Sequence, residues 1–306
     1  MGATHVVILL ATRNGAKHLS QQLASLAGQT HQNWSIIASD DGSDDETTDI
    51  LKAFARGMFD HRVTLLRGPQ QGSAQNFLSL LRAAGDADHI AFCDQDDFWF
   101  PTKLERAVEA LSKIDGPALY GTRTIVTDAE LRMQRPSLLF GRAPGFGNAL
   151  VQNIAGGNTM LMNRAALSIL QPASLSASNV IAHDWWCYQM IVGCGGRFLF
   201  DPEPSLFYRQ HGRNLIGANG GMHARLTRFL RVVSGEYSGW MDGNLDALVR
   251  ARQWLTPDNQ RKLDTLCETR QAPIFKRIYG ALRAGLYRQT FRGTLALWLA
   301  VLIGRL

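Results

Sequence analysis

The sequence predicts an α/β protein with a doubly wound, mostly parallel central sheet flanked by helices and a helical extension at the C-terminus. Three observations predict this fold class: apolar strand-like runs alternate with helix-like segments, polar clusters follow three of those runs, and the last part of the chain is helical and basic. A chain of 306 residues suits one domain of about 220 residues with an accessory segment. We therefore predict a main domain over residues 1–220 and an extension over residues 221–306.

Four apolar runs in the first third are interpreted as strands, at residues 6–11, 34–38, 63–66 and 89–93. Uninterrupted apolar runs are typical of parallel strands that are buried on both faces. Between them, Leu19, Leu23 and Leu26 share one helix face, and further helices are predicted at residues 47–54 and 74–83. After residue 120 the pattern changes to shorter strands and Gly/Pro-rich loops, with helices at 163–169 and from 183, and a strand at 206–209.

The net charge of +6 is concentrated in the extension. Residues 221–306 contain 14 Lys and Arg against 6 Asp and Glu, whereas the rest of the chain contains 18 against 20. A nucleic-acid-binding module normally carries its basic surface on the folded domain itself, so this distribution argues against that class of protein.

The four cysteines, at positions 93, 187, 194 and 267, have no spacing that would hold zinc, and a chain of this length needs no disulfides to fold. The N-terminus lacks the basic and long apolar regions of a signal peptide. The longest apolar run, at residues 295–303, is much shorter than the roughly 20 residues of a membrane-spanning helix. We expect reduced thiols and a cytoplasmic protein.

Polar clusters follow three predicted strands, at residues 12–15, 40–45 and 94–97. The carboxyl ends of parallel strands lie at one edge of a sheet, where such folds bind their ligands. The clusters are therefore expected to converge on one crevice. As an alternative, Asp, Asn, Ser and Gly at strand ends are also ordinary turn and N-cap residues.

The third cluster places Asp94, Asp96 and Asp97 directly after a buried strand. Unpaired, these carboxylates would repel one another, so a cation is expected among them. Oxygen ligands suit Mg²⁺ or Mn²⁺, which typically takes one or two carboxylates and completes its shell with substrate phosphates. The aromatic residues 98–100 suggest a half-buried site, although fully solvated turn carboxylates are the alternative.

Together these segments resemble the family-2 inverting glycosyltransferases of the GT-A type. The resemblance rests on Ala11-Thr12-Arg13-Asn14-Gly15, on Asp40-Asp41-Gly42-Ser43-Asp44-Asp45, and on Asp94-Gln95-Asp96-Asp97 ahead of Pro101 and Lys103-Leu104. It covers residues 6–104 and continues more loosely to about residue 217, through His183-Asp184-Trp185-Trp186 and Tyr208-Arg209-Gln210-His211. The later part is most similar to bacterial rhamnosyltransferase-like enzymes. Each motif is weak alone, but the ordered set is specific.

The resemblance implies a role for each matching position. The positions around the nucleotide and sugar are Ala11, Thr12, Asn14, Asp41 and Asp94, the metal ligand is Asp96, and the catalytic base is Asp184. The family often has an aromatic residue in the first loop, and this chain has Arg13 there instead. The identity of the nucleobase is therefore open.

Asp184 also suits the role of base on physical grounds. Inversion in a single displacement needs one carboxylate to accept the proton of the acceptor hydroxyl. At a helix start, the helix dipole favours its charged form, and the neighbouring Trp185 and Trp186 offer aromatic surface to an acceptor sugar. The alternative is a helix N-cap followed by two core tryptophans.

His211 follows the predicted strand at residues 206–209. A neutral imidazole here would complete the metal shell or contact the diphosphate, and Arg209 or Arg213 would offset phosphate charge. The alternative is an ordinary polar loop residue.

The extension carries Ile274, Ile278, Leu282 and Leu286 four residues apart, and seven Lys or Arg without an acid from Arg270 onward. A basic amphipathic helix of this kind is typical of an anchor on anionic membranes, which we expect for residues 271–306. The alternative is a helical segment that packs on the main domain or on a second subunit.

We predict a glycosyltransferase that uses a nucleotide-diphosphate sugar, with rhamnose as a candidate, a divalent metal, and a glycan or lipid-linked acceptor, without a nucleic-acid partner. A non-catalytic α/β module that binds nucleotide or glycan, or that scaffolds a membrane complex, is the alternative. A phosphotransfer enzyme would also cluster Asp at strand ends, but it would need a Lys on a later strand, which is not evident here.

Overall fold

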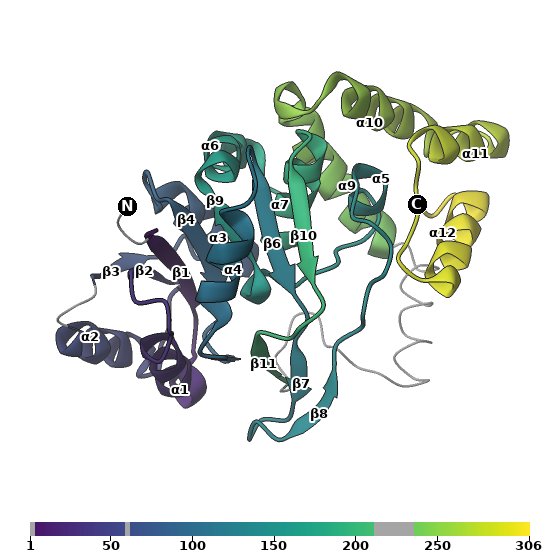
Figure 1. The fold of residues 1–306 in the computed structure, drawn as a ribbon. Helices are drawn as coiled ribbons and strands as arrows, with labels where there is room; N and C mark the ends of the chain where they lie inside the picture. Colours follow the sequence, from purple (N-terminus) through teal and green to yellow (C-terminus); the bar gives the residue numbers. More distant parts are fainter. Residues whose placement is uncertain (1–3, 59–61, 211–235) are drawn as a thin grey trace.

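The structure, a computed structural model, describes residues 4–58, 62–210 and 236–306. Strands and helices alternate through its first third, as predicted (Figure 1). These elements are β1 (Val6–Thr12), α1 (Ala16–Ala27), β2 (Trp34–Asp40), α2 (Thr47–Gly57), β3 (Val63–Arg67), α3 (Ser73–Ala83) and β4 (His89–Cys93). The middle of the chain adds β5 (Phe98–Trp99), α4 (Lys103–Leu111), β6 (Ala118–Thr122), β7 (Ile125–Thr127), β8 (Met133–Pro136), α5 (Phe146–Ala149), η1 (Gly157–Thr159), β9 (Leu161–Asn163), α6 (Arg164–Ala173), η2 (Ser174–Ser176), α7 (His183–Gly193), β10 (Arg197–Asp201) and β11 (Leu206–Arg209).

A seven-stranded sheet forms the centre of the molecule, in the order β10-β6-β9-β4-β1-β2-β3. Its neighbouring strands pair in parallel except for β9, which is antiparallel to both β4 and β6. The chain adds β2 and β3 on one side of β1 and then crosses to place β4 on the other. This confirms the predicted fold class. The carboxyl ends of β1 and β4 meet where the strand order reverses, which is the usual place for a ligand crevice.

The central strand β1 is buried along its whole length because helices cover both faces of the sheet. Its alternate side chains enter different cores, since successive residues of a strand point to opposite faces. Leu9 packs in the core formed with α3, α6 and α7, whereas Ile8 packs in the core formed with α1 and α4. The uninterrupted apolar run at the start of the sequence reflects this burial on both sides.

The edge strand β3 differs from the expected burial on both faces. Leu65 and Leu66 are 38% and 37% exposed, because β3 ends the sheet and pairs only with β2.

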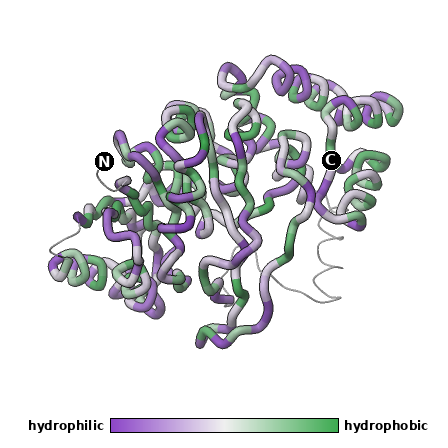
Figure 2. Tube along the Cα trace, in the orientation of Figure 1, coloured by the Kyte–Doolittle hydropathy of each residue, from purple (hydrophilic) through white to green (hydrophobic). Residues whose placement is uncertain are grey.

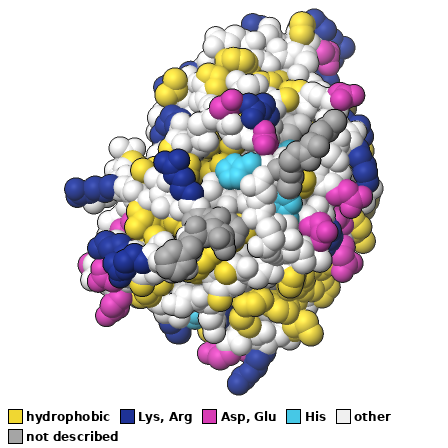
Figure 3. Space-filling model, turned by 60° about the vertical axis from the view of Figure 1, so that its left-hand side comes forward, with side chains coloured by type: hydrophobic (Ala, Val, Ile, Leu, Met, Phe, Trp, Pro, Cys, Tyr) yellow, Lys and Arg dark blue, Asp and Glu magenta, His cyan; other side chains and the backbone are white. Residues whose placement is uncertain are grey.

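On the face drawn in Figure 3, Lys and Arg side chains are interspersed with Asp and Glu rather than gathered in one basic patch.

A second, four-stranded sheet lies beside the carboxyl end of the central one, in the order β5-β11-β7-β8. In it, β11 is antiparallel to β5 and parallel to β7. The short strand β5 follows the acidic cluster after β4, so this sheet connects that cluster to the later part of the chain.

The C-terminal part contains α9 (Glu236–Arg250), η3 (Arg252–Trp254), α10 (Pro257–Thr269), α11 (Ile274–Arg283) and α12 (Phe291–Ile303). The side chain of Thr256 caps α10 at the amide of Asn259, and that of Thr290 caps α12 at the amide of Gly293. Leu263 and Val301 join the core formed with α3 and α7, so these helices pack on the main domain. The predicted boundary at residue 220 lies outside the described residues. Within the described chain, no helix is both long and apolar enough to span a membrane.

Candidate functional site

The loops after β1 and β2 are tied together at the carboxyl edge of the sheet. The hydroxyl of Thr12 donates to the Asp40 carboxylate at 3.0 Å. The amide of Asn14 donates to the Ser43 hydroxyl at 2.8 Å, and the Asn14 side-chain oxygen accepts from the Asp44 amide at 3.0 Å. Asn14 has a φ of 50°, a conformation that Asn tolerates better than most residues. Ala11 lies buried on β1 beside this network.

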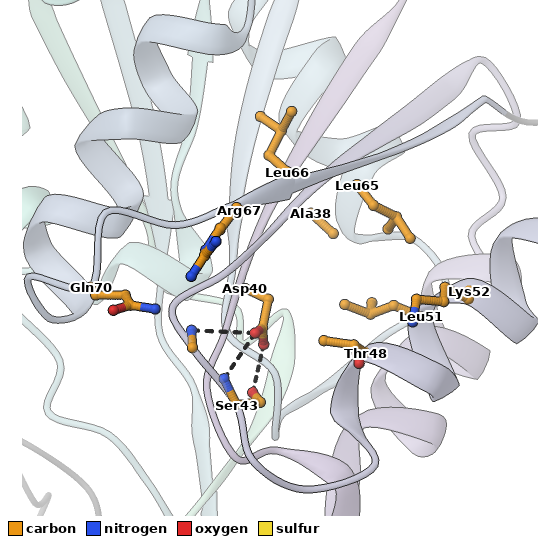
Figure 4. Close-up of a pocket in the computed structure, with 11 residues that line it drawn as sticks. Ala38, Asp40, Ser43, Thr48, Leu51, Lys52, Leu65, Leu66, Arg67 and Gln70 are labelled. Atoms are coloured by element: carbon orange, nitrogen blue, oxygen red, sulfur yellow. Dashed lines mark hydrogen bonds between the residues drawn. The ribbon is translucent and has the colours of Figure 1, made fainter.

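The two adjacent aspartates of the second loop have different roles in the structure. Asp41 is buried, and its carboxylate accepts from the amides of Gln70 at 2.6 Å and Gly72 at 3.0 Å. It therefore holds the loop after β3. Asp40 is half-buried and lines a pocket of about 460 Å³ (Figure 4). The sequence motif indicated Asp41 as the nucleotide-binding residue, whereas the residue that lines this pocket is Asp40.

This pocket lies between the loop after β2, helix α2 and the edge strand β3. Leu51 and Leu65 form part of its apolar wall, and Arg67 and Gln70 add polar atoms (Figure 4). Asp40 stays fixed at its rim because its carboxylate accepts from the Ser43 amide at 2.9 Å and from the Ser43 hydroxyl at 2.5 Å. The pocket therefore combines an apolar wall with polar groups that could hydrogen-bond to a ligand.

The loop after β4 lies directly beside the first loop. The Gln95 side chain accepts from the Arg13 amide at 2.8 Å and donates to the Arg13 carbonyl at 2.9 Å. The predicted convergence of the strand-end clusters is therefore present. Burial, together with the charges of Asp96 and Asp184, raises the pKa of Asp94 to about 7. Thus Asp94, Asp96 and Asp184, which are 90 residues apart at their extremes, share one electrostatic environment.

Asp184 lies in the first turn of α7, one residue after its start at His183, so it is not the N-cap. Its carboxylate accepts from the Gly157 amide at 2.8 Å and from the Trp185 amide at 2.6 Å. Burial raises the pKa of Asp184, and these backbone hydrogen bonds partly offset that effect. The result is a fixed, partly desolvated carboxylate, held by the turn that also contacts the acidic loop after β4.

The short turn η1 connects the acidic cluster to Asp184, a role that was not predicted from the sequence. The Asn158 side chain donates to the buried Asp97 carboxylate at 2.5 Å. The Asn158 carbonyl accepts from the buried Lys103 ammonium at 2.8 Å. The neighbouring Gly157 supplies the amide that holds Asp184, and a Cβ at Gly157 would lie 2.5 Å from Nε2 of His183. The sequence feature that could have indicated this role is the Gly157-Asn158 pair in a Gly-rich loop.

Burial raises the pKa of Asp97 and lowers the pKa of Lys103 to about 7. Arg209 is also buried and donates to the Asp96 carbonyl at 2.8 Å and to the Gln21 side chain at 2.7 Å. The guanidinium therefore supports the loop backbone. This differs from the expectation that Arg209 would be available to phosphate.

The two tryptophans after Asp184 lie in the core. Trp186 is fully buried, and Trp185 is 7% exposed and donates from its indole to the Ala149 carbonyl at 2.7 Å. Their rings face protein rather than an open surface, which corresponds to the core alternative for this pair. His211 and Arg213 lie outside the described residues.

His183 anchors the start of α7 beneath the site. Its ring stacks on Phe77 with centroids 3.9 Å apart and meets the edge of Phe92 at 4.7 Å. Burial lowers the pKa of His183 to about 3, so the imidazole is neutral at physiological pH.

We expect the cost of His183→Asn to depend on pH. The unfolded chain binds this proton near pH 6.5, whereas the folded chain binds it only near pH 3. The stability that neutral His183 contributes is therefore complete above pH 6.5 and is lost as the pH falls toward 3. The loss of unfolding free energy caused by His183→Asn should be smaller by about 1–2 kcal/mol at about pH 5 than at about pH 8. Urea unfolding of the wild type and the variant at both pH values measures this difference. An equal loss of unfolding free energy at both pH values would contradict a buried, neutral His183.

The comparisons with known proteins agree with this geometry. Residues 7–169 match the model of the family described as Glycosyl transferase family 2. The dTDP-rhamnosyl transferase RfbG of Shigella flexneri is 26% identical over 234 residues, which cover 72% of this chain and 77% of that protein. The Escherichia coli UDP-Glc:alpha-D-GlcNAc-diphosphoundecaprenol beta-1,3-glucosyltransferase WfgD is 28% identical over 123 residues, covering 40% of this chain and 47% of that protein.

Two solved structures share the fold. Staphylococcus aureus TarS 1–349 in complex with UDP-GlcNAc has a TM-score of 0.55 at 13% identity, covering 92% of this chain and 89% of that one. The mannosyltransferase PcManGT of Pyrobaculum calidifontis, in complex with GDP-Man and Mn²⁺, has a TM-score of 0.52 at 18% identity, covering 98% and 85%. At these identities, the likeness establishes the fold alone.

Proposed function

This chain belongs to glycosyl transferase family 2, and from that premise we propose that it transfers a sugar, with inversion, from a nucleoside-diphosphate donor to a hydroxyl of a cell-surface glycan or lipid-linked acceptor. The observation that carries the proposal is that the turn at Gly157 and Asn158 links the Asp184 carboxylate to the acidic loop after β4, at the carboxyl edge of the sheet. A base and a diphosphate-binding cluster are the two parts that a single displacement requires.

For the donor, we propose that the nucleotide binds across the loops after β1, β2 and β4. Ala11, Thr12 and Asn14 line its first loop, and Asp94 takes the ribose side. Asp41 acts by holding the loop after β3, while Asp40 presents its carboxylate to the pocket. Since Asn14 and Asp40 are both fixed by Ser43, the donor site is largely formed before the nucleotide binds.

The acidic cluster fits a divalent cation, either Mg²⁺ or Mn²⁺. Burial and the charges of Asp96 and Asp184 raise the pKa of Asp94, which means that ionising this carboxyl group is unfavourable here. A bound cation would offset that cost. Within the described residues, no three His, Cys, Asp or Glu side chains converge to form a complete metal site. Asp96, with Asp94 beside it, would hold the ion through a partial shell that the donor phosphates complete. When bound, the ion stabilises negative charge on the departing diphosphate.

In the proposed reaction, the acceptor oxygen attacks the anomeric carbon while the bond from that carbon to the diphosphate oxygen breaks. Asp184 accepts the proton of the acceptor hydroxyl, so no covalent sugar–enzyme intermediate forms. Gly157 and the start of α7 fix the orientation of the carboxylate. The raised pKa of Asp184 makes it a stronger base than a solvated aspartate.

Rhamnose on a thymidine diphosphate is our first candidate for the donor sugar. The name of RfbG supports it, since the similarity to that protein extends over most of both chains. A lipid-linked acceptor is supported by the name of WfgD, which specifies a diphosphoundecaprenol substrate. We further propose a cytoplasmic location at the inner face of the membrane. The four cysteines are free thiols, which suits a reducing compartment.

A panel of nucleotide sugars, assayed with and without Mn²⁺ for release of the nucleoside diphosphate, tests the proposal. We expect release from one class of donor, led by dTDP-rhamnose, and little release after the metal is removed by EDTA. Binding of nucleotide without release from any donor, with acceptor present, would favour the non-catalytic module instead.

A further inference from the structure

The outer faces of α11 and α12 form an exposed apolar surface. On α11, Phe275, Tyr279 and Leu282 follow helical spacing on one face, and Phe275 is 83% exposed. On α12, four of the exposed apolar residues recur in the same way, namely Phe291, Leu295, Leu299 and Leu302, with Phe291 79% exposed. Figure 2 shows how apolar α12 is along most of its length. We call these seven residues the outer stripe.

The outer stripe is distinct from the face that holds these helices on the protein. Ala281 and Leu286 are buried on the inner side of α11 and the turn after it, and Leu297 and Val301 are buried on α12. The predicted stripe through Ile274, Ile278, Leu282 and Leu286 is therefore divided, since Leu286 lies inside and Leu282 is 62% exposed. Folding buries one apolar face of each helix and leaves a second one in water, where it has no stabilising role.

The two helices form one unit. The Arg277 guanidinium on α11 donates to the Val301 carbonyl at 2.9 Å and to the Leu302 carbonyl at 2.7 Å at the end of α12. Arg270 donates to the Leu306 carbonyl at 2.9 Å and to the Asp242 carboxylate at 2.5 Å, which fastens the chain end to α9. These two arginines are engaged internally.

Four other cations accompany the outer stripe. Lys276 and Arg283 are exposed on the same turns of α11, and Arg292 and Arg305 are exposed near the two ends of α12. None of the four forms an ion pair with a described residue. The chain has no acidic residue after Glu268. The surface therefore combines apolar side chains with positive charges that no described acidic side chain pairs.

We propose that the outer stripe and its four cations dock the protein on an anionic lipid bilayer. Exposed apolar side chains on two short helices, flanked by Lys and Arg, suit the boundary between acyl chains and anionic headgroups. A second copy of the chain is a poorer occupant, because a symmetric contact through this face would place cations against cations. The 13 residues of α12 rise about 20 Å along the helix, so it lies on the surface rather than across the bilayer.

The docking surface is mechanically connected to the candidate site. The turn between α11 and α12 packs on α5, where Asn148 donates to the Tyr287 carbonyl at 3.0 Å. On its other side, α5 is hydrogen-bonded to α7. The Ala149 carbonyl accepts from the Trp185 indole, and the Asn148 side-chain oxygen accepts from the Tyr188 hydroxyl. Asp184 lies in the first turn of this same helix, α7. Docking would thus orient the site toward a lipid-linked acceptor. This orientation rests on the proposed function, but the docking proposal itself does not depend on it.

Flotation of the full chain with vesicles tests the docking. Vesicles of phosphatidylcholine with phosphatidylglycerol are compared with vesicles of phosphatidylcholine alone, for the wild type, Phe291→Gln/Leu295→Gln and Arg283→Glu/Arg292→Glu. We expect the wild type to float with the anionic vesicles, and each double variant to bind them at least about tenfold more weakly. Leu175→Gln is the matched control, because Leu175 is 76% exposed on η2, away from these helices, and it should bind as the wild type does.

Three results would overturn the docking proposal: equal binding of the wild type to both kinds of vesicle, unchanged binding of both double variants, or a wild-type dimer in solution that Phe291→Gln/Leu295→Gln converts to monomer. The last would assign the face to self-association. Circular dichroism and thermal melting check that the substituted residues, which are exposed, leave the fold intact. Because the readout is vesicle binding, failure here would leave the proposed glycosyl transfer untouched, and failure of donor turnover would leave docking untouched.

Discussion

Asp184→Asn should lower sugar transfer by about 10²- to 10⁴-fold while leaving donor affinity nearly unchanged. The amide is close to the carboxylate in size, but it cannot accept the proton of the acceptor hydroxyl. Both carboxylate oxygens of Asp184 accept backbone hydrogen bonds, from Gly157 and Trp185. The amide nitrogen must then face one of these N–H groups, so we also expect a stability cost of about 1–3 kcal/mol.

Three measurements separate these effects: transfer rate with acceptor, donor binding by calorimetry, and urea unfolding. Asp201→Asn is the control, because Asp201 is a half-buried carboxylate paired with Arg106 at 2.6 Å, on β10. It should lose stability but keep its rate per folded molecule. A parallel collapse of donor affinity and rate in Asp184→Asn would show that Asp184 serves the donor site or the fold instead of acting as the base.

Asp96→Asn should remove about 3–5 kcal/mol of transition-state stabilisation, a rate loss of roughly two to four orders of magnitude, through weaker metal binding. The fold should persist, because the loop is held through the Asp96 carbonyl by Arg209 and through Asp97 by Asn158. Donor turnover is measured across a Mn²⁺ titration, and the variant should need far more Mn²⁺ than the wild type for any remaining rate.

The same Asp201→Asn control should show the wild-type Mn²⁺ dependence. Either unchanged turnover in Asp96→Asn or wild-type activity that survives EDTA in full would reject the metal-dependent mechanism. Calorimetric titration of Mn²⁺ with the nucleoside diphosphate gives an independent readout, since the partial shell is expected to need the phosphates.

The candidate site could be predicted to the level of its segments. The clusters after β1, β2 and β4 follow apolar runs, and the topology of a parallel sheet brings such ends to one edge. Asp94 could be placed in an acidic cluster for the same reason. The choice between Asp40 and Asp41 could not be predicted, because adjacent residues point in opposite directions and the turn decides which one enters the pocket.

The surroundings of Asp184 show a similar division. Its position at a helix start could be predicted from the motif, but the aromatic pair after it reads equally well as sugar surface or as core. The structure buries both indoles, because α7 is covered by α5 and by the C-terminal helices, which are remote in the sequence. The turn at Gly157 and Asn158 likewise acquires its role only from partners far along the chain.

The sequence by itself determined the α/β class, the alternation of strands and helices up to β4, the three polar loops and the basic character of the C-terminus. These features depend on local periodicity and on composition, which are written in short segments. Only the tertiary structure decided that Asp184 shares its environment with Asp94, that Arg209 supports a loop, and that α11 and α12 present one apolar face to the core and another to water. Those outcomes depend on packing between distant segments, and a helix with apolar residues around most of its circumference does not reveal which side will be covered.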